Sequence, residues 1–324
     1  MRARRSRAPL RAAAGEPGRS VRIEAHAKLN LGLAVGPRRP DGFHELATIF
    51  QSISLADTLI ARPRTAGFTL RVRHENAALR GGRAGAEAGV PRGPHNLVLR
   101  AARLFAARTG LKAGAAFELV KRIPSGAGLG GGSADAAAAL AALAALFRIR
   151  LSPDERLAIA AEIGADVPFA TLGGTALGLG RGERLRPLRL SRPLRTLIAV
   201  PRWRIRTGPA FTEIDRNKYG LTVWGAKLRF AQSIGRKSVS PERALLLGNS
   251  FESVLGRREA DFISLRSRLE QVGVRHCHLT GSGSAVFGVL AARASIARVM
   301  AGFTGNEALY EARSTRRAMV RQRI

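Results

Sequence analysis

The most regular pattern in the chain covers residues 21–33, VRIEAHAKLNLGL. Its odd positions are all apolar and most of its even positions are polar. This period of two residues is typical of a β-strand with one buried face. Lys28 and Asn30 both occupy even positions. The first predicted strand therefore carries a cation and an amide on the same face.

Apolar patterns and turn signals divide the rest of the chain into further elements. Strands are predicted at residues 47–53, 67–72, 115–123, 194–200, 276–280 and 285–290. Helices are predicted at residues 96–109, 133–147, 241–256, 258–272 and 292–303. Another helix should begin at Ser152 and Pro153, because Ser152 can cap it and Glu155 completes a capping box. Residues 36–42 and 81–94 are predicted to be a turn and a loop, since both are rich in glycine.

The length of 324 residues allows two domains of ordinary size. Hydrophobic residues make up 45% of the chain, which is enough for a substantial core. Because the pattern changes after Gly182, we predict an N-terminal domain at residues 21–190 and a C-terminal domain at residues 191–324. Residues 1–20 are rich in arginine with one acid. They are predicted to form a basic, disordered tail, with an organelle transit peptide as the alternative.

The net charge of +31 needs an explanation, because strongly basic proteins often bind nucleic acids, membranes or anionic ligands. Nearly all of this charge is arginine, scattered through every segment. Only two Trp and two Tyr could stack on bases, and no zinc-finger spacing or basic region before heptads is present. The composition therefore argues against a nucleic-acid partner. The longest apolar run, residues 134–147, is too short to span a membrane.

The single cysteine, Cys277, excludes an intrachain disulfide and a multi-cysteine metal site. One cysteine suits a reducing compartment, and we predict a cytoplasmic location. The thiol itself is interpreted as a small packed side chain of the core. The sequence leaves the oligomeric state open between a monomer and a homodimer.

Residues 124–135, PSGAGLGGGSAD, carry the strongest chemical signal. A predicted strand leads into them and the alanine-rich predicted helix follows. Glycines let backbone N–H groups approach an anion, and the helix N-terminus adds a partial positive charge, so we predict a phosphate-binding loop. Ser133 is equally consistent with the N-cap of that helix. The predicted phosphate contacts are Pro124, Gly126, Gly128, Leu129, Gly130, Gly131, Gly132 and Ser133.

Three segments together resemble the motifs of the GHMP kinase family, in that family's order. They are residues 27–33, residues 124–140 and residues 279–287, LTGSGSAVF. The resemblance implies an α+β fold of two domains, the first like domain 2 of ribosomal protein S5 and the second ferredoxin-like. It also implies a small-molecule kinase that uses ATP and Mg²⁺. The second glycine loop at the site would consist of Gly281, Ser282 and Gly283.

Further segments narrow the resemblance to the GHMP kinases that act on 4-diphosphocytidyl-2-C-methyl-D-erythritol. Residues 27–30 (AKLN) and 39–44 (RPDGFH) resemble the N-terminal signature of these kinases. Residues 163–169 (IGADVPF) are similar to their catalytic-aspartate segment, and residues 95–98 (HNLV) to their adenine-side helix. The resemblance implies phosphorylation of the 2-hydroxyl group of this CDP-linked substrate, a step of the non-mevalonate isoprenoid pathway.

The same resemblance implies roles for single residues. Asp166 would accept the proton of the hydroxyl group, while Lys28 would keep that carboxylate ionised and neutralise nearby charge. Asn96 would lie beside the adenine. No carboxylate cluster marks a metal site, so Mg²⁺ is implied by the ATP chemistry alone. The residues implied to bind the CDP-linked substrate are Asn30, Phe43, His44, Thr207 and Phe211.

The residues themselves leave alternatives open. Without the resemblance, Asp166 would be interpreted as an aspartate at a helix end or in a turn. For Phe43 and Phe211, the alternative interpretation is a place in the core. Phe43 stands where these kinases have tyrosine, and Ser250 stands where they have aspartate. The nearest alternative activity is that of a homoserine or mevalonate-type GHMP kinase. A non-catalytic, nucleic-acid-binding relative is the alternative from another class.

Overall fold

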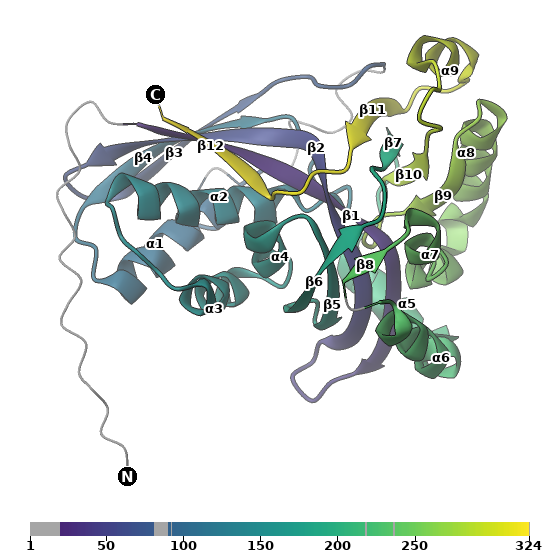
Figure 1. Ribbon diagram of the computed structural model, residues 1–324, viewed down its shortest axis with the longest axis horizontal. Coiled ribbons are helices and arrows are strands. Elements are labelled where there is room, and N and C mark those ends of the chain that lie inside the picture. The colour runs from purple at the N-terminus through teal and green to yellow at the C-terminus, as the bar shows by residue number, and fades with distance from the viewer. Residues whose placement is uncertain (1–19, 81–89, 92, 218, 236, 324) are drawn as a thin grey trace.

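The structure is a computed structural model that describes residues 20–80, 90 and 91, 93–217, 219–235 and 237–323. Helices and strands are mixed along the chain and arranged around two sheets (Figure 1). The chain therefore has the predicted α+β class. The predicted tail, apart from Ser20, and most of the predicted loop at residues 81–94 lie outside the described residues.

The large sheet is built on an antiparallel hairpin of two long strands, β1 (Val21–Arg38) and β2 (His44–Arg64). Residues 21–26 of β1 alternate between buried and partly exposed, as the sequence predicts, whereas residues 27–36 are all buried, Lys28 and Asn30 included. The strand order is β12-β1-β2-β5-β6-β8, and β4 pairs with both β2 and β3. The other strands are β3 (Phe68–His74), β4 (Gly114–Lys121), β5 (Thr175–Gly180), β6 (Arg184–Leu190), β8 (Ser238–Val239) and β12 (Met319–Arg323).

Helices from the first half of the chain lie together beside the large sheet (Figure 1). They are α1 (Leu97–Thr109), α2 (Gly131–Leu146), α3 (Pro153–Ile163) and α4 (Val167–Leu172). The alanine-rich α2 contacts β1, β2 and α1, because its small side chains allow a close approach. The capping box of Ser152 and Glu155 begins α3, as predicted. One apolar core joins these helices to the sheet.

The second sheet has four antiparallel strands in the order β11-β7-β10-β9. Cys277 in β9 is buried, and burial raises the pKa of its thiol to about 12. The predicted domain boundary near residue 190 falls between β6 of the large sheet and β7 of the second sheet. The later strands β8 and β12 nevertheless belong to the large sheet, so both sheets contain residues from beyond the boundary. The exact division into domains stays a prediction. The strands are β7 (Arg195–Val200), β9 (Arg275–Leu279), β10 (Val286–Val289) and β11 (Ala308–Arg313).

Two predicted helices of the second half are wrong in length. The helix predicted at residues 241–256 is broken, because Gly248 adopts a left-handed φ of 63°. A 3₁₀ helix, η1, follows this glycine, and a second short one, η2, comes after it. The helix predicted at residues 292–303 begins later. The bounds here are α7 (Pro241–Leu245), η1 (Ser250–Val254), η2 (Gly256–Arg258), α8 (Glu259–Gln271) and α9 (Ile296–Gly302).

Three helices were not predicted from the sequence, namely α4, α5 (Thr207–Asn217) and α6 (Tyr219–Ser233). Helices α5 and α6 lie beside the β1–β2 hairpin (Figure 1). Trp224 of α6 packs on Gly36 of β1, where an added Cβ would come within 2.5 Å of the indole ring. The glycine therefore lets this helix approach the strand, a requirement that is visible only once both elements are placed.

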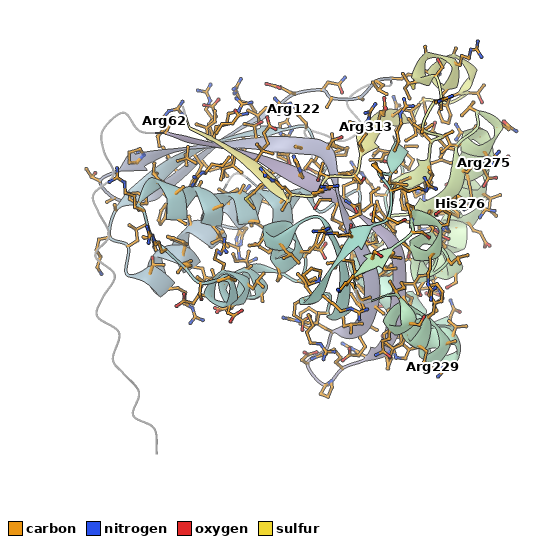
Figure 2. The ribbon with its side chains drawn as sticks, viewed as in Figure 1. Arg62, Arg122, Arg229, Arg275, His276 and Arg313 are labelled. Atoms are coloured by element: carbon orange, nitrogen blue, oxygen red, sulfur yellow. The ribbon has the colours of Figure 1, made fainter. Side chains whose placement is uncertain are left out.

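Arginines are distributed over both sheets, as the sequence predicts. Within the described residues, no helix is long and apolar enough to cross a membrane. Figure 2 labels arginines on elements that lie far apart in the fold, namely Arg62, Arg122, Arg229, Arg275 and Arg313.

Candidate active site

A pocket of about 390 Å³ lies where the two halves of the chain meet. Strands β1 and β2, both glycine loops, the start of α5 and the residues before α4 all contribute to it. The structure thus brings together segments that are far apart in the sequence. The predicted site residues that line this pocket are Lys28, Asn30, Phe43, His44, Gly128, Gly130, Ser133, Asp166, Thr207, Phe211, Gly281 and Ser282.

A second pocket, of about 580 Å³, adjoins the first at the glycine-rich loop. All eight predicted phosphate contacts line it, together with Asn96 and Lys121. The residues that line both pockets are Gly128, Gly130, Ser133 and Thr207. A molecule in one pocket would therefore reach a molecule in the other at the N-terminus of α2, where backbone N–H groups and the helix dipole favour an anion.

Lys28 and Asp166 face each other in the first pocket. The Nζ atom of Lys28 lies 3.6 Å from Oδ2 of Asp166. The lysine side chain is 8% exposed, whereas the aspartate side chain is 35% exposed. Asp166 precedes α4 and its side chain does not cap that helix. Its carboxylate therefore has oxygen lone pairs directed to a solvent-accessible pocket beside a fixed cation.

Asn30 connects β1 to the second glycine loop. Its Oδ1 accepts hydrogen bonds from Nζ of Lys28, at 2.5 Å, and from the backbone N–H of Gly281, at 2.9 Å. Its Nδ2 donates to Oγ1 of Thr48 at 2.7 Å. The side chain of Asn30 is thus engaged at both ends, and it holds Lys28 in place. This geometry suits a role of Asn30 in positioning Lys28 and the second glycine loop, in addition to the predicted contact of Asn30 with the substrate.

The two glycine loops touch, and the contact explains one glycine directly. Gly128 has a φ of 82°, and an added Cβ would lie 2.0 Å from the carbonyl oxygen of Thr280. The backbone N–H of Ala285 also donates to the carbonyl of Ala127, at 3.1 Å. No other residue type fits at position 128 without moving the second loop.

Ser133 is not the N-cap of α2, which corrects one of its two interpretations. The helix begins at Gly131, two residues earlier than predicted, and Gly130 occupies the capping position in a left-handed conformation. No side chain caps the helix. Ser133 therefore lies in the first turn, and it lines both pockets. Its role as a phosphate contact stays a prediction.

The far end of the first pocket is aromatic. The ring of His44 stacks on that of Phe211, with centroids 4.7 Å apart and an interplanar angle of 19°. Nε2 of His44 is 2.8 Å from Oδ1 of Asp215, in α5. Phe43 is 50% exposed and lies under the guanidinium of Arg181, 4.8 Å from its ring centroid. His44, and not Phe43, thus stacks on Phe211.

Asp215 and Arg181 were missed from the sequence. Asp215 lies in a stretch for which no helix was predicted, and the pairing of Arg181 with Phe43 depends on how the β5–β6 turn meets the loop after β1. Arg181 is the one arginine that lines the first pocket within the described residues. Neither residue has a local signal that distinguishes it from other charged residues of the chain.

A buried ionic cluster lies beneath the glycine-rich loop, and it too was missed. Nζ of Lys121 contacts Oδ2 of Asp57 and lies 2.7 Å from Oδ2 of Asp135. Burial raises the pKa of Asp135 well above its usual range, and the repulsion by Asp57 adds to this effect. Burial would lower the pKa of Lys121, but the two carboxylates outweigh it and raise that pKa.

The segment before η1 anchors the second glycine loop. Nδ2 of Asn249 donates to the carbonyl oxygens of Leu279 and Gly281, both at 2.9 Å. Glu252 accepts a hydrogen bond from the backbone N–H of Leu279 at 2.8 Å. Ser250 accepts one from the backbone N–H of Val35 at 3.2 Å. The serine at this position therefore binds β1 and is 2% exposed, away from the pocket.

Asn96 is placed in the second pocket, and its side chain is already engaged. Its Oδ1 accepts a hydrogen bond from the backbone N–H of Val98 at 2.8 Å, which caps α1. Its Nδ2 donates to the carbonyl of Pro91 at 2.6 Å. Asn96 shapes this pocket by fixing the start of α1, and its contact with adenine stays a prediction.

Comparison with known proteins finds matches over most of the chain. A family model described as the GHMP kinases N terminal domain matches residues 96–174. The chain is 38% identical over 279 residues to the 4-diphosphocytidyl-2-C-methyl-D-erythritol kinase of Pelotomaculum thermopropionicum, covering 86% of this chain and 92% of that relative.

Solved structures agree with this result. The crystal structure of a 4-(cytidine 5'-diphospho)-2C-methyl-D-erythritol kinase is similar with a TM-score of 0.68 and 33% identity, covering 90% of this chain and 98% of that one. A homoserine kinase from Cytophaga hutchinsonii reaches a TM-score of 0.65 at only 17% identity, covering 95% of this chain and 98% of that one. This second likeness shows a shared fold alone.

Proposed function

This chain belongs to the GHMP kinases and, within them, to the 4-diphosphocytidyl-2-C-methyl-D-erythritol kinase family, and on that premise we propose that it phosphorylates the 2-hydroxyl group of this CDP-linked substrate with ATP. The reaction would be a step of non-mevalonate isoprenoid biosynthesis. The observation that carries the proposal is the pairing of Lys28 with Asp166 beside two touching glycine loops. The chain is a small-molecule kinase, and the proposal concerns its acceptor and the roles of its residues.

The nucleotide would bind in the pocket at the glycine-rich loop. The N–H groups at the start of α2 and the helix dipole would hold its phosphates. Within the described residues, no group of three or more His, Cys, Asp or Glu side chains is placed to hold a metal ion. Mg²⁺ would be supplied with ATP and would neutralise phosphate charge, and Ser133, which lines this pocket, is the residue that would contact it.

Asp166 would act as the general base. The hydroxyl oxygen of the acceptor would form a bond to the γ-phosphorus, the bond from that phosphorus to the bridging oxygen would break, and ADP would leave. The proton of the hydroxyl group would pass to Asp166, whose exposed carboxylate lies in the acceptor pocket. Lys28, whose Nζ lies 3.6 Å from that carboxylate, would neutralise negative charge as the phosphoryl group moves.

The aromatic end of the first pocket would bind the base of the substrate. Phe43, His44 and Phe211 offer flat surfaces and a ring nitrogen, which suit a pyrimidine that needs stacking and hydrogen bonds. Because His44 already stacks on Phe211, we propose that the base binds against this pair. The guanidinium of Arg181 would then be close enough to the substrate to interact with its diphosphate.

We further propose a cytoplasmic location, supported by the single buried cysteine and the requirement for ATP. The partner would be the small-molecule substrate. A monomer and a homodimer fit the proposal equally. The basic composition leaves an RNA-binding role as the alternative from another class, to be tested by the salt dependence of RNA binding.

The proposal is tested by measuring ADP release from Mg·ATP with three acceptors: 4-diphosphocytidyl-2-C-methyl-D-erythritol, mevalonate and homoserine. We expect turnover with the first alone, and NMR of the product should show the new phosphate on the 2-hydroxyl group. Turnover with mevalonate or homoserine instead would replace the proposed acceptor. Folded protein without turnover on any acceptor would refute the kinase assignment.

A further inference from the structure

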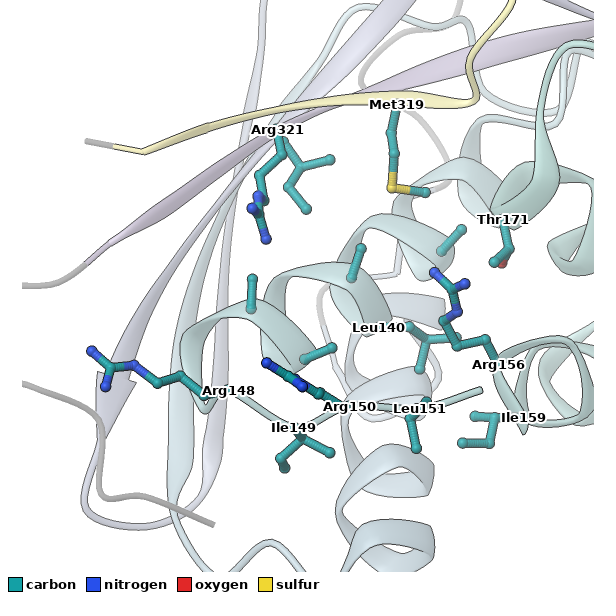
Figure 3. A pocket seen from close by; sticks show the side chains of 15 residues that line it. Leu140, Arg148, Ile149, Arg150, Leu151, Arg156, Ile159, Thr171, Met319 and Arg321 are labelled. Carbon is teal, nitrogen blue, oxygen red and sulfur yellow. The ribbon is translucent and has the colours of Figure 1, made fainter. Parts of the chain in front are cut away.

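A third pocket, of about 600 Å³, lies away from both pockets of the active site and shares no lining residue with them. It is bordered by the second half of α2, the connection from α2 to α3, the start of α3, and the strands β1 and β12 (Figure 3). Its volume falls within the range of roughly 300–1,000 Å³ that is typical of small-molecule sites. The proposed kinase reaction gives it no role.

The lining of this pocket combines an apolar floor with cations. Of its 15 lining residues, ten are apolar, four are arginines and one is threonine, so none of the lining residues is acidic. The floor owes its depth to small side chains, because α2 presents four alanines there. These alanines are Ala137, Ala141, Ala144 and Ala145.

The arginines come from different elements and lie around the apolar floor. In Figure 3, Arg156 of α3 and Arg321 of β12 extend from opposite sides toward the interior of the pocket, whereas Arg148 points away from them. Arg150 lies on the connection between α2 and α3. Within the part of the chain that the structure describes, Arg150, Arg156 and Arg321 form no ion pair. These three guanidinium groups therefore have no carboxylate partner among the described residues.

We propose that this pocket binds a small molecule that carries a phosphate group at one end of an apolar chain. The chain would cover the apolar floor and remove it from water, which is favourable in proportion to the area buried. Guanidinium groups bind phosphate oxygens with paired, charge-assisted hydrogen bonds. Three arginines without an acidic partner match the double negative charge of a phosphate ester better than the single charge of a carboxylate.

Two other occupants fit the pocket less well. A second copy of this chain would bring the same arginines toward each other across a twofold axis, and like charges in an interface are unfavourable. A membrane surface would contact exposed side chains, whereas this site is concave and its apolar residues lie between helices α2 and α3 and strands β1 and β12. A single chain with an anionic head fits both the shape and the charge.

The test is calorimetric titration of the full-length protein with octyl phosphate below its micelle concentration. Octyl glucoside has the same chain with a neutral head, and inorganic phosphate has the head without a chain. We expect one site for octyl phosphate and binding at least tenfold weaker for each of the other two probes. Equal binding of octyl glucoside, or no binding of octyl phosphate, would overturn the proposal.

Variants locate the site. The double variant Arg156→Gln and Arg321→Gln should weaken octyl phosphate binding at least tenfold. The matched control is Arg229→Gln and Arg275→Gln, which removes the same charge from exposed positions outside the pocket and should change binding less than twofold. An equal loss in both pairs would show a general effect of charge and would refute the proposed site.

A second variant tests the apolar floor without changing charge. Ala144→Phe places a ring in the pocket and should abolish binding of octyl phosphate while the kinase activity stays within twofold of the unmodified protein. Retained binding in this variant, with activity intact, would exclude the floor as the site of the chain. Should Ala144→Phe fail to fold, the two arginine pairs decide the question alone.

Vesicles of phosphatidylglycerol test the membrane alternative. If the double variant Arg156→Gln and Arg321→Gln still binds these vesicles as the unmodified protein does, the result would favour a membrane and overturn the proposal.

Discussion

Two lysine–carboxylate groups flank the glycine-rich loop, and they contain the same residue types in opposite surroundings. Lys28 faces one aspartate, Asp166, across 3.6 Å, and that aspartate is 35% exposed to the acceptor pocket. Lys121 lies between two aspartates, Asp57 and Asp135, and none of these three side chains is more than 5% exposed. The two groups therefore differ in the number of ion-pair partners of the lysine and in the exposure of the carboxyl groups to solvent.

The difference fits the roles that we propose for the two groups. The carboxylate of Asp166 is the proposed proton acceptor, because the pocket gives a substrate access to it. Oδ2 of each aspartate below the loop is occupied by the same ammonium group, and Asp57 also accepts hydrogen bonds from the backbone N–H groups of Arg122 and Ile123. That cluster holds the start of the glycine-rich loop in place. Lys121 and Asp135 line the second pocket and not the acceptor pocket, and Oδ1 of Asp135 has no hydrogen-bond partner within the described residues.

The largest expected effect comes from breaking the exposed pair. Asp166→Asn keeps the shape of the side chain but removes the base, so we expect kcat to fall by roughly 10²–10⁴. The unfolding midpoint in urea should stay close to that of the unmodified protein, because Asp166 is partly exposed. Steady-state ADP release measures the first quantity, and a variant with near-normal kcat would remove Asp166 from the catalytic role.

Breaking the buried cluster should instead cost stability. Lys121→Met leaves the buried carboxyl groups of Asp57 and Asp135 without their cation, and we expect a loss of about 3–5 kcal/mol in the free energy of unfolding. The matched control is Lys28→Met, which leaves a partly exposed carboxylate and should lose activity with a much smaller change in stability. Urea unfolding of both variants gives the comparison. Similar stability losses in the two would contradict the division drawn here.

A smaller effect is expected from the charged partner of His44. Asp215→Ala removes the hydrogen bond to Nε2 of that histidine, which should raise the KM for the CDP-linked acceptor about tenfold while kcat and the KM for ATP change little. Glu213→Ala, on the same helix, serves as the control, because Glu213 pairs with Arg216 and not with His44. An increase in the KM for ATP would show that Asp215 acts on the fold and not on acceptor binding.

The smallest effect concerns Asp135, and it depends on pH. Burial raises the pKa of this carboxyl above the ordinary value of 3.8, so the folded state keeps its proton at pH values where the unfolded state has lost it. This contribution to stability is present at low pH and is lost as the pH rises through the raised pKa. Asp135→Asn should therefore cost only about 1 kcal/mol near pH 4, where the carboxyl with its raised pKa is protonated, because the amide resembles the protonated acid.

Urea unfolding at a series of pH values, from about pH 4 to pH 8, checks this expectation. The free energy of unfolding of the unmodified protein should contain a decrease with rising pH that is absent from Asp135→Asn. A loss of several kcal/mol in the variant at every pH would mean that Asp135 is ionised in the folded protein. It would then be an equal partner of Asp57 in the cluster.

Several local features could be predicted from the sequence because their signals are local. The alternation in residues 21–33 predicted β1 and placed Lys28 beside Asn30, and the structure links these two side chains by a hydrogen bond. The capping residues before α3 and the glycines before α2 act within a few positions of the chain. The resemblance of the three motifs to the GHMP kinases added the expected activity and residue roles, which periodicity alone does not indicate. The comparisons confirm the family.

Other features were decided only by the tertiary structure, because they join positions that are distant in the chain. Glycine is required at position 128 because a Cβ there would collide with the carbonyl oxygen of Thr280. Asp57 contacts Lys121 only because β2 pairs with β4. Stacking of His44 on Phe211 likewise depends on α5, which had no predicted counterpart. A sequence specifies short-range hydrogen bonds and periodic burial directly, whereas contacts between distant segments exist only after the sheets and helices have packed.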